Sequence, residues 1–177
     1  MGFVSFGKGV SGNNNTFAKD LIERTSTNIT IPNYITKIGV GAFRDFSILE
    51  NIFIPNSVES IEARAFMSCV GLTNISIPNK VQIIKAYTFY GCTSLTNISI
   101  SNVEKIESYA FEGCTGLTNI SIPNSVTNIS GVAFNGCSNI ITITIDKPAG
   151  SISGAPWGAK NATVVWANEE VETNEAN

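Results

Sequence analysis

The nonapeptide GLTNISIPN occupies Gly71–Asn79 and recurs, letter for letter, at Gly116–Asn124. Midway between these two copies lies a near copy, SLTNISISN, at Ser94–Asn102. In each copy apolar and polar residues alternate, which is typical of a strand with one face buried. The proline that follows ends the strand, because proline cannot donate a hydrogen bond to a ladder. The sequence therefore predicts the same half-buried strand at several places along the chain.

Three further kinds of residue repeat with the same period. Five phenylalanines are spaced 23, 23, 22 and 23 residues apart, and the cysteines and prolines follow the same spacing. In the fourth unit Ser101 replaces the proline, and one residue is missing between Ser101 and Val103, which explains the spacing of 22. In the first unit Phe46 takes the place of the cysteine. The repeated residues are Phe43, Phe66, Phe89, Phe111 and Phe134; Cys69, Cys92, Cys114 and Cys137; and Pro32, Pro55, Pro78 and Pro123.

One such unit is too small to bury its own apolar side chains, whereas stacked units cover one another. The sequence therefore predicts a mainly β solenoid of about five to six rungs, each of 22–23 residues, with parallel strands, over residues 26–147. We expect its first strand at Ile29–Ile31 and its last at Ile143–Ile145. The second half of a unit, Val81–Cys92 in the third, returns the chain along the other side of the core. Its conformation is left open between strand, 3₁₀ turn and short helix.

The two ends of a solenoid expose apolar surface and a free sheet edge, so both ends need covering. Residues 1–25 are expected to form an N-terminal cap, in which Thr16–Arg24 has the apolar spacing of a helix. Residues 148–167 are expected to form a C-terminal β cap. The final segment, 168–177, carries four glutamates and little apolar material, and is expected to be a disordered acidic tail. The apolar residues of the C-terminal cap are Trp157, Val164, Val165 and Trp166.

Composition limits the classes of partner. The chain is 43% hydrophobic and 14% charged, with a net charge of −3 and no basic cluster. Nucleic-acid binding depends on Lys and Arg that neutralise phosphates, so no nucleic-acid partner is expected. No apolar run approaches the roughly 18 residues of a membrane span, so no membrane insertion is expected. The first residues lack the pattern of a signal peptide, which leaves the export route open.

The repeat LTNISIPNSVTNISGVAFNGC, at Leu117–Cys137, resembles the BspA-like subclass of leucine-rich repeats, whose units end in A-F-x-x-C. The resemblance covers about residues 26–145. It implies a surface-exposed adhesion or protein-binding role, extracellular or on a cell surface, and no catalytic site. The segment Ser151–Trp166 is similar to the closing segment of such repeats in bacterial and phage proteins. The alternative is therefore a structural module of a phage or virion appendage, in a tail or as a decoration.

Candidate chemical sites are few. The four cysteines form one file along the stack, so they cannot surround a tetrahedral metal ion, and buried free thiols are expected. Disulfides between rungs stay a less favoured alternative, because stacked Cβ atoms are expected somewhat too far apart. Gly7–Gly12 matches G-x-G-x-x-G but lacks the βαβ unit and the acidic residue that a dinucleotide site needs. No cofactor is expected.

Catalytic residues are not expected either. In the stacked register Glu62, Lys85 and Glu107 are successive neighbours in one column, which indicates cross-strand ion pairs rather than an acid–base pair. The chain contains no histidine, so triads and metal sites that depend on histidine are absent. The sequence therefore predicts that the protein is not an enzyme.

The outward side of the first strand of each rung is the candidate binding face. Its columns are uncharged amides and hydroxyls, apart from Glu50 and the aromatic Phe53. One interpretation is a ladder of asparagines that bond to one another along the stack. The other is a flat or gently concave surface that binds a protein or a glycan by many hydrogen bonds, with Phe53 as an anchor. The candidate residues are Asn51, Phe53, Thr73, Asn74, Ser76, Thr96, Asn97, Ser99, Thr118, Asn119 and Ser121.

Overall fold

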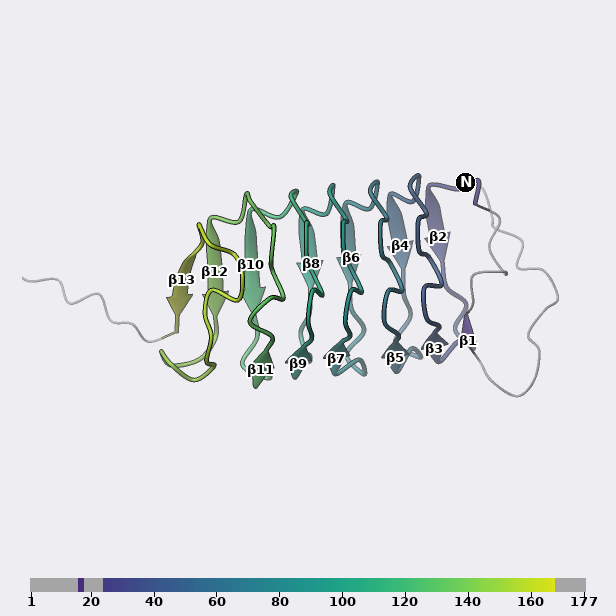
Figure 1. The fold of residues 1–177 in the computed structure, drawn as a ribbon. Coiled ribbons are helices and arrows are strands. Elements are labelled where there is room, and N and C mark those ends of the chain that lie inside the picture. Colours follow the sequence, from purple (N-terminus) through teal and green to yellow (C-terminus); the bar gives the residue numbers. More distant parts are fainter. Residues whose placement is uncertain (1–15, 18–23, 168–177) are drawn as a thin grey trace, which may run out of the picture.

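The computed structural model describes residues 16–17 and 24–167, and in this part of the chain every regular element is a short β-strand. The strands lie in two rows along a solenoid (Figure 1). The first row is β2 (Asn28–Thr30), β4 (Asn51–Phe53), β6 (Asn74–Ser76), β8 (Asn97–Ser99), β10 (Asn119–Ile122), β12 (Thr142–Ile145) and β13 (Thr163–Trp166). The second row is β1 (Thr16–Phe17), β3 (Lys37–Ile38), β5 (Ser60–Ile61), β7 (Ile83–Ile84), β9 (Lys105–Ile106) and β11 (Asn128–Ile129).

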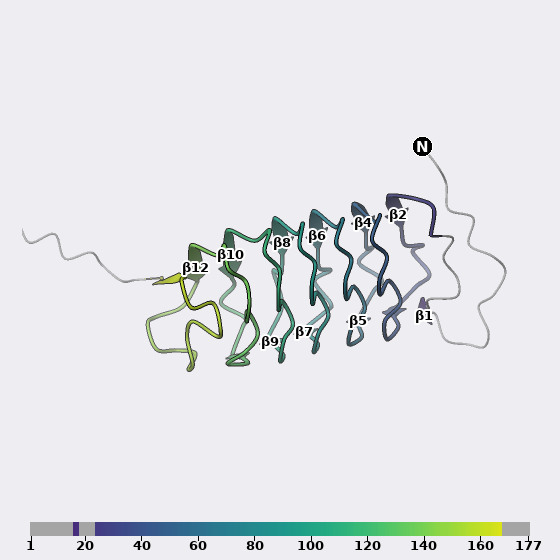
Figure 2. The ribbon, with the colours of Figure 1, turned by 45° about the horizontal axis from the view of Figure 1, so that its top comes forward.

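Strands of the first row pair in parallel with strands one rung away, and like residues face each other. Asn28 pairs with Asn51, Asn51 with Asn74, and Asn74 with Asn97. The predicted solenoid of parallel strands with rungs of about 23 residues is thus confirmed (Figure 2). The first and last strands predicted for the repeat differ slightly from the structure: β2 is Asn28–Thr30 rather than Ile29–Ile31, and β12 begins at Thr142 rather than Ile143.

The alternation in the sequence decides which side of each strand is buried. In β6 the central Ile75 is buried, whereas Asn74 and Ser76 on either side of it are exposed. Leu72 and Ile77, which flank the strand, are also buried. Each rung therefore sends its leucine and isoleucines into a common core and presents its polar residues outward.

The second half of each rung, whose conformation the sequence left open, is a two-residue strand followed by turns. In the third rung this strand is β7, and Ile84 is its buried residue. The backbone then passes through a left-handed position two residues after the core phenylalanine. Asp45 and Ser68 hold this position in the first two rungs, and glycines hold it in the next three, where φ is between 68° and 70°. Glycine adopts this conformation without steric cost and aspartate is among the side chains that tolerate it, whereas serine adopts it at some cost.

The first residue of GLTNISIPN is glycine for a steric reason that does not involve its backbone conformation. A Cβ atom on Gly71 would lie 2.6 Å from the carbonyl oxygen of Ser47, and one on Gly116 would lie 2.8 Å from that of Leu95. In both places the backbone of the preceding rung is too close for a side chain. The two identical copies therefore share their first residue because they share a close approach between rungs.

A column of stacked phenylalanine rings runs through the core. Neighbouring ring centroids are 5.1, 5.5, 5.4 and 5.2 Å apart, and the ring planes differ by at most 11°. All five rings are completely buried. The spacing is close to the separation of adjacent strands, so each rung adds one ring to the column. The members of this phenylalanine column are Phe43, Phe66, Phe89, Phe111 and Phe134.

Each row of strands is interrupted once within the solenoid. The first row breaks between β8 and β10, and the second row breaks between β5 and β7. The first interruption lies beside the shortened fourth rung, where Ser101 replaces proline and one residue is missing. The rungs on either side of the second interruption keep the spacing of 23 residues, so the missing residue does not account for it.

The N-terminal end differs from expectation where the structure describes it. The helix expected from the spacing of Thr16–Arg24 is wrong at Thr16–Phe17, because these two residues form β1 and pair in parallel with β3. A strand here continues the second row of the solenoid by one position, which satisfies the backbone of β3 on that side. The rest of the expected cap, 1–15 and 18–23, lies outside the described residues, as does the expected acidic tail at 168–177.

At the other end, β13 pairs with β12 and extends the first row by one strand. Trp157 is completely buried against the last rung, and its Nε1 donates to the carbonyl oxygen of Ser153 at 2.8 Å. Val164 and Trp166 pack partly against the core, whereas Val165 points outward and is 41% exposed. Three of the four apolar residues expected to cover this end do so. The division of the chain at residue 147 stays a prediction.

Replacing Phe89 by alanine is expected to cost about 3–5 kcal/mol of unfolding free energy, because a buried aromatic ring leaves a cavity in the middle of the column. Chemical denaturation monitored by circular dichroism measures this loss. Phe53→Ala, which removes an exposed ring, is the matched control and is expected to change stability by less than about 1 kcal/mol. A loss below about 1 kcal/mol for Phe89→Ala would contradict the inward column.

Candidate binding face

The strand face is the outward side of the first row, from β2 to β13. Pairing in register arranges its side chains in three columns. These are an asparagine column (Asn28, Asn51, Asn74, Asn97, Asn119), a threonine column (Thr27, Glu50, Thr73, Thr96, Thr118) and a serine column (Thr30, Phe53, Ser76, Ser99, Ser121, Thr144). Ten of the eleven candidate residues are exposed, and Thr73 is half-buried. The residues from β4, β6 and β8 share one sheet, whereas Thr118, Asn119 and Ser121 belong to the next sheet, beyond the interruption. The sequence thus placed the candidate residues together, but on a surface with a break in it.

The asparagines do not form the continuous ladder that one interpretation predicted. Asn51 Nδ2 donates to Asn28 Oδ1 at 3.0 Å, and Asn97 Nδ2 donates to Asn74 Oδ1 at 2.9 Å. Between these pairs the amides turn to a threonine in their own rung, as Asn74 Nδ2 does to Thr73 Oγ1 at 2.9 Å. The amides therefore bond in alternate pairs, because each one has two competing acceptors.

This arrangement leaves hydrogen-bonding groups free. Among the described residues, nothing donates to the Oδ1 atoms of Asn51, Asn97 and Asn119. The hydroxyl groups of Ser76 and Ser121 also lack a partner within the described part of the chain. Exposed groups of this kind bond to water or to a ligand without the desolvation cost of a buried polar group.

The strand face is hollowed near Phe53. A shallow groove of about 400 Å³ crosses β4, β6 and β8 between the asparagine and serine columns. A smaller depression of about 200 Å³ adjoins it and is lined by Phe53, Ile54, Ser76 and Pro78, among others. The Phe53 side chain is 61% exposed at this depression. An aromatic ring that is largely exposed on a mostly polar face is a candidate anchor.

The sequence named Phe53 as the one apolar residue that faces outward, and the structure adds two more. Ile141 is 64% exposed in the threonine column, and Val165 is 41% exposed in the serine column. Ile141 could have been found by extending the threonine column by one rung. Val165 could not, because Thr163–Trp166 lacks the landmarks of the repeat. The strand face therefore has apolar residues near both ends and polar residues in the middle.

A larger depression, about 570 Å³, lies elsewhere, along the loops that join the two rows. Its polar side chains are mostly bonded to one another. Lys80 Nζ lies 2.7 Å from Glu59 Oε1, and Gln82 Nε2 donates to Glu104 Oε1 at 2.8 Å. We regard the strand face as the better candidate, although its groove is smaller, because several of its amide oxygens and hydroxyl groups are free.

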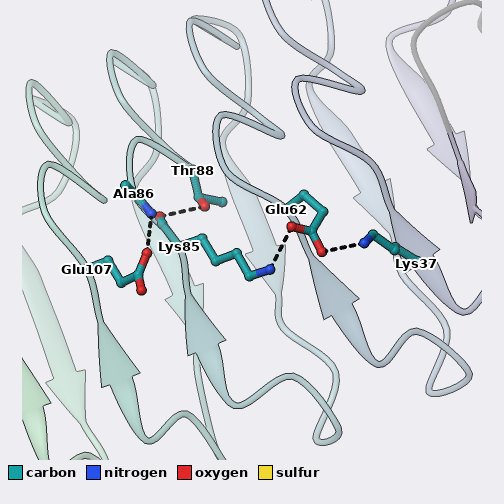
Figure 3. A network of polar contacts seen from close by, with 6 residues as sticks. All are labelled: Lys37, Glu62, Lys85, Ala86, Thr88 and Glu107. Atoms are coloured by element: carbon teal, nitrogen blue, oxygen red, sulfur yellow. Dashed lines mark hydrogen bonds and ion pairs between the residues drawn. The ribbon is translucent and has the colours of Figure 1, made fainter.

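Most of the charged side chains near the second row pair across rungs. Glu62 accepts from Lys37 at 2.9 Å and from Lys85 at 2.6 Å, so the predicted contact between Glu62 and Lys85 is confirmed (Figure 3). Glu107 does not continue the alternation as predicted. It accepts instead from the backbone N–H of Ala86 at 3.0 Å and pairs with Lys105 at 3.4 Å.

The environment of Glu62 determines its charge state. Partial burial raises the pKa of this carboxyl, but the hydrogen bonds and positive charges of Lys85 and Lys37 outweigh burial, so its pKa is lowered overall. A carboxyl that acts as a general acid needs a raised pKa. Glu62 is therefore held ionised as a structural ion-pair partner.

The cysteines form a buried file of free thiols beside the phenylalanine column. Each Sγ donates to the carbonyl oxygen of a phenylalanine in the preceding rung, as Cys92 does to Phe66 at 3.1 Å and Cys114 to Phe89 at 3.0 Å. Burial raises the pKa of the Cys69 thiol to about 12 and that of the Cys137 thiol to about 11. The file therefore connects rungs by hydrogen bonds and carries no thiolate at ordinary pH.

Other possible sites receive little support. The G-x-G-x-x-G match at Gly7–Gly12 lies outside the described residues. Within residues 24–167, no group of three or more His, Cys, Asp or Glu side chains is placed to hold a metal ion. No helix long and apolar enough to cross a bilayer occurs in the described part of the chain.

Two rows of stacked parallel strands around a leucine-, isoleucine- and phenylalanine-filled core define a leucine-rich-repeat scaffold. The family model of the BspA-type leucine-rich repeat region matches residues 13–141 and 94–172, in six copies. The chain belongs to this family. No curated protein matches it significantly.

Solved structures agree with this assignment. The chain is 33% identical to a leucine-rich cell surface protein of Faecalibacterium prausnitzii, with a TM-score of 0.69 over 71% of this chain and 34% of that one. It is 31% identical to a leucine-rich repeat protein of Bacteroides ovatus, with a TM-score of 0.68 over 79% of this chain and 37% of that one. A leucine-rich repeat protein of T. pallidum, 22% identical with a TM-score of 0.70 over 82% and 71%, shares the fold. The chain thus spans little more than a third of the first two proteins.

The thiols are expected to resist labelling in the folded protein. Reaction with a chromogenic disulfide reagent at about pH 8 should be slow, because the raised pKa values leave almost no thiolate and burial blocks access. Denaturant should release all four thiols, and this serves as the control. Rapid labelling of several thiols before unfolding would contradict the prediction, because it would show that the reagent reaches these cysteines in the folded protein.

Glu62→Gln is expected to destabilise the protein at neutral pH, because it leaves Lys37 and Lys85 without their shared partner. The folded pKa of Glu62 lies below its ordinary value of 4.5, so the ion pairs stabilise the fold above that pH and are lost as the pH falls through the folded pKa. The difference from the unchanged protein should therefore shrink near pH 3. Urea denaturation at both pH values tests this, with Glu59→Gln, an exposed pair member, as the control. An equal difference at both pH values would exclude the ionised pair as the cause.

Proposed function

We propose that this protein is a non-enzymatic recognition or adhesion module that binds a protein or a glycan ligand through its strand face. The observation that supports this most directly is the repetition of free amide and hydroxyl groups along one exposed, nearly uncharged face. A ligand in contact with several rungs meets the same groups several times, so weak single contacts add up.

Membership of the repeat family favours a scaffold over an enzyme. The ionisable groups agree with this preference. The pKa of the Glu62 carboxyl is displaced downward, through pairing with lysines. Perturbed groups in active sites are arranged for proton transfer or nucleophilic attack, and a paired carboxylate on a strand row serves neither purpose.

We propose a cell-surface location, since one of the similar proteins is described as a cell surface protein of a bacterium. A role in a phage or virion appendage has no observation in its favour beyond the resemblance of the C-terminal segment.

Phe53→Ala and Ser76→Lys are each expected to abolish ligand binding while leaving the fold intact. The first removes the exposed ring, and the second puts a charge into the centre of the groove. Binding is measured by screening the protein on glycan and surface-protein arrays and then titrating the best ligand with each variant.

The controls place the same changes elsewhere. Tyr34→Ala removes another exposed ring, in the turn after β2, and Asn128→Lys adds a charge to β11 in the second row. Both control variants should bind normally. Unchanged binding in Phe53→Ala and Ser76→Lys together would refute the strand face as the site.

A further inference from the structure

The charge on the strand face limits the class of ligand. Within its columns the structure places one charged residue, Glu50, among the described rungs. The lysines and glutamates of the paired network lie instead on the second row. An anionic glycan or a nucleic acid needs cationic partners, and a charged peptide needs complementary charges. A neutral ligand fits this face best.

The free groups are suited to a ligand that is rich in hydroxyl groups. The Oδ1 atoms of Asn51 and Asn97 accept, and the hydroxyl of Ser76 both donates and accepts. Sugar hydroxyls do the same, so each one forms a donor–acceptor pair with an amide or a serine. A bound peptide strand instead takes its main-chain hydrogen bonds from a sheet edge, and the strand face offers side chains only.

The repeat distance also favours one kind of polymer. The rungs are 5.1–5.5 Å apart in the phenylalanine column, which is close to the length of one pyranose unit in an extended β-linked chain. Successive sugar units along the solenoid would therefore meet the same residue types at each rung, with a free asparagine Oδ1 at every second rung, at Asn51 and Asn97. A polypeptide strand advances about 3.3 Å per residue and would fall out of phase with the rungs after one step.

Phe53 and the adjoining depression provide the apolar part of such a site. The ring is 61% exposed and borders a depression of about 200 Å³ that opens beside the groove. The C–H face of a pyranose ring stacks on an aromatic ring, and this contact fixes the position of one sugar unit. The asparagines and serines of β6 and β8 then bind the units that follow along the groove.

We propose that the strand face binds a neutral, extended β-linked glycan that runs along the solenoid axis, with one sugar unit stacked on Phe53. This inference rests on the strand face being the recognition surface. It adds the chemical class of the ligand, its direction along the solenoid and the residue that fixes its register.

The test uses the full chain and a glycan array with neutral and acidic members, followed by titration calorimetry with soluble β1,4-linked oligosaccharides from the disaccharide to the hexasaccharide. Binding should be confined to neutral glycans, and affinity should rise with each added unit until the groove is filled. Phe53→Ala should weaken binding of the hexasaccharide by about two- to tenfold, as loss of an aromatic stacking contact does. Tyr34→Ala should leave it unchanged.

The outcomes separate this inference from the proposed function. Preference for acidic glycans, or an affinity that does not depend on chain length, overturns the inference. Binding of a surface protein but of no glycan, with loss in Phe53→Ala and Ser76→Lys, also overturns it and keeps the strand face as the recognition surface. Binding of the oligosaccharides that both strand-face variants leave unchanged overturns the inference and the proposed site together. Circular dichroism of each variant shows whether the fold is intact.

Discussion

The structure depends on the vertical contact between equivalent residues of successive rungs. The stacked rings of Phe66 and Phe89, 5.5 Å apart and nearly parallel, show this contact in its simplest form. From the second rung to the fifth, the cysteine beside the ring adds a thiol hydrogen bond to the preceding rung, and the strands add backbone hydrogen bonds on both sides. Because no rung buries its own apolar residues, each one is stable only between neighbours that repeat its pattern. Conservation of the period through the chain is therefore a condition of folding.

The same register that builds the core also builds the surface. Ile75 lies in the core because its side chain points inward, and Asn74 and Ser76 face outward for the same geometrical reason. A column of core residues thus requires a column of surface residues at the same spacing. A protein that repeats its strands for stability therefore also has a periodic surface. What can still vary is which polar residues occupy the outward positions. Here that choice is amides and hydroxyls on the first row and ion pairs on the second.

The sequence was most informative where structure follows from the period. The phenylalanine column, the parallel pairing and the outward position of Phe53 all derive from counting residues. Features that depend on tertiary geometry were not accessible. A β cap was expected at the C-terminal end, but the bounds of β13 and its pairing with β12 were not, because Thr163–Trp166 lacks the repeated pattern. The asparagine amides choose between a threonine in the same rung and an asparagine in the next, and small differences in position decide between partners of equal chemistry.

The gap in the first row of strands and the gap in the second row lie at different positions along the solenoid axis. Where β5 and β7 fail to pair, Asn51 and Asn74 of the opposite row are still paired, and Lys85 reaches across to Glu62. Where β8 and β10 separate, β9 and β11 remain bonded. The two gaps therefore lie at different rungs, and no plane perpendicular to the solenoid axis passes through both of them. Separating the molecule across its axis at either gap would also require breaking paired strands in the opposite row.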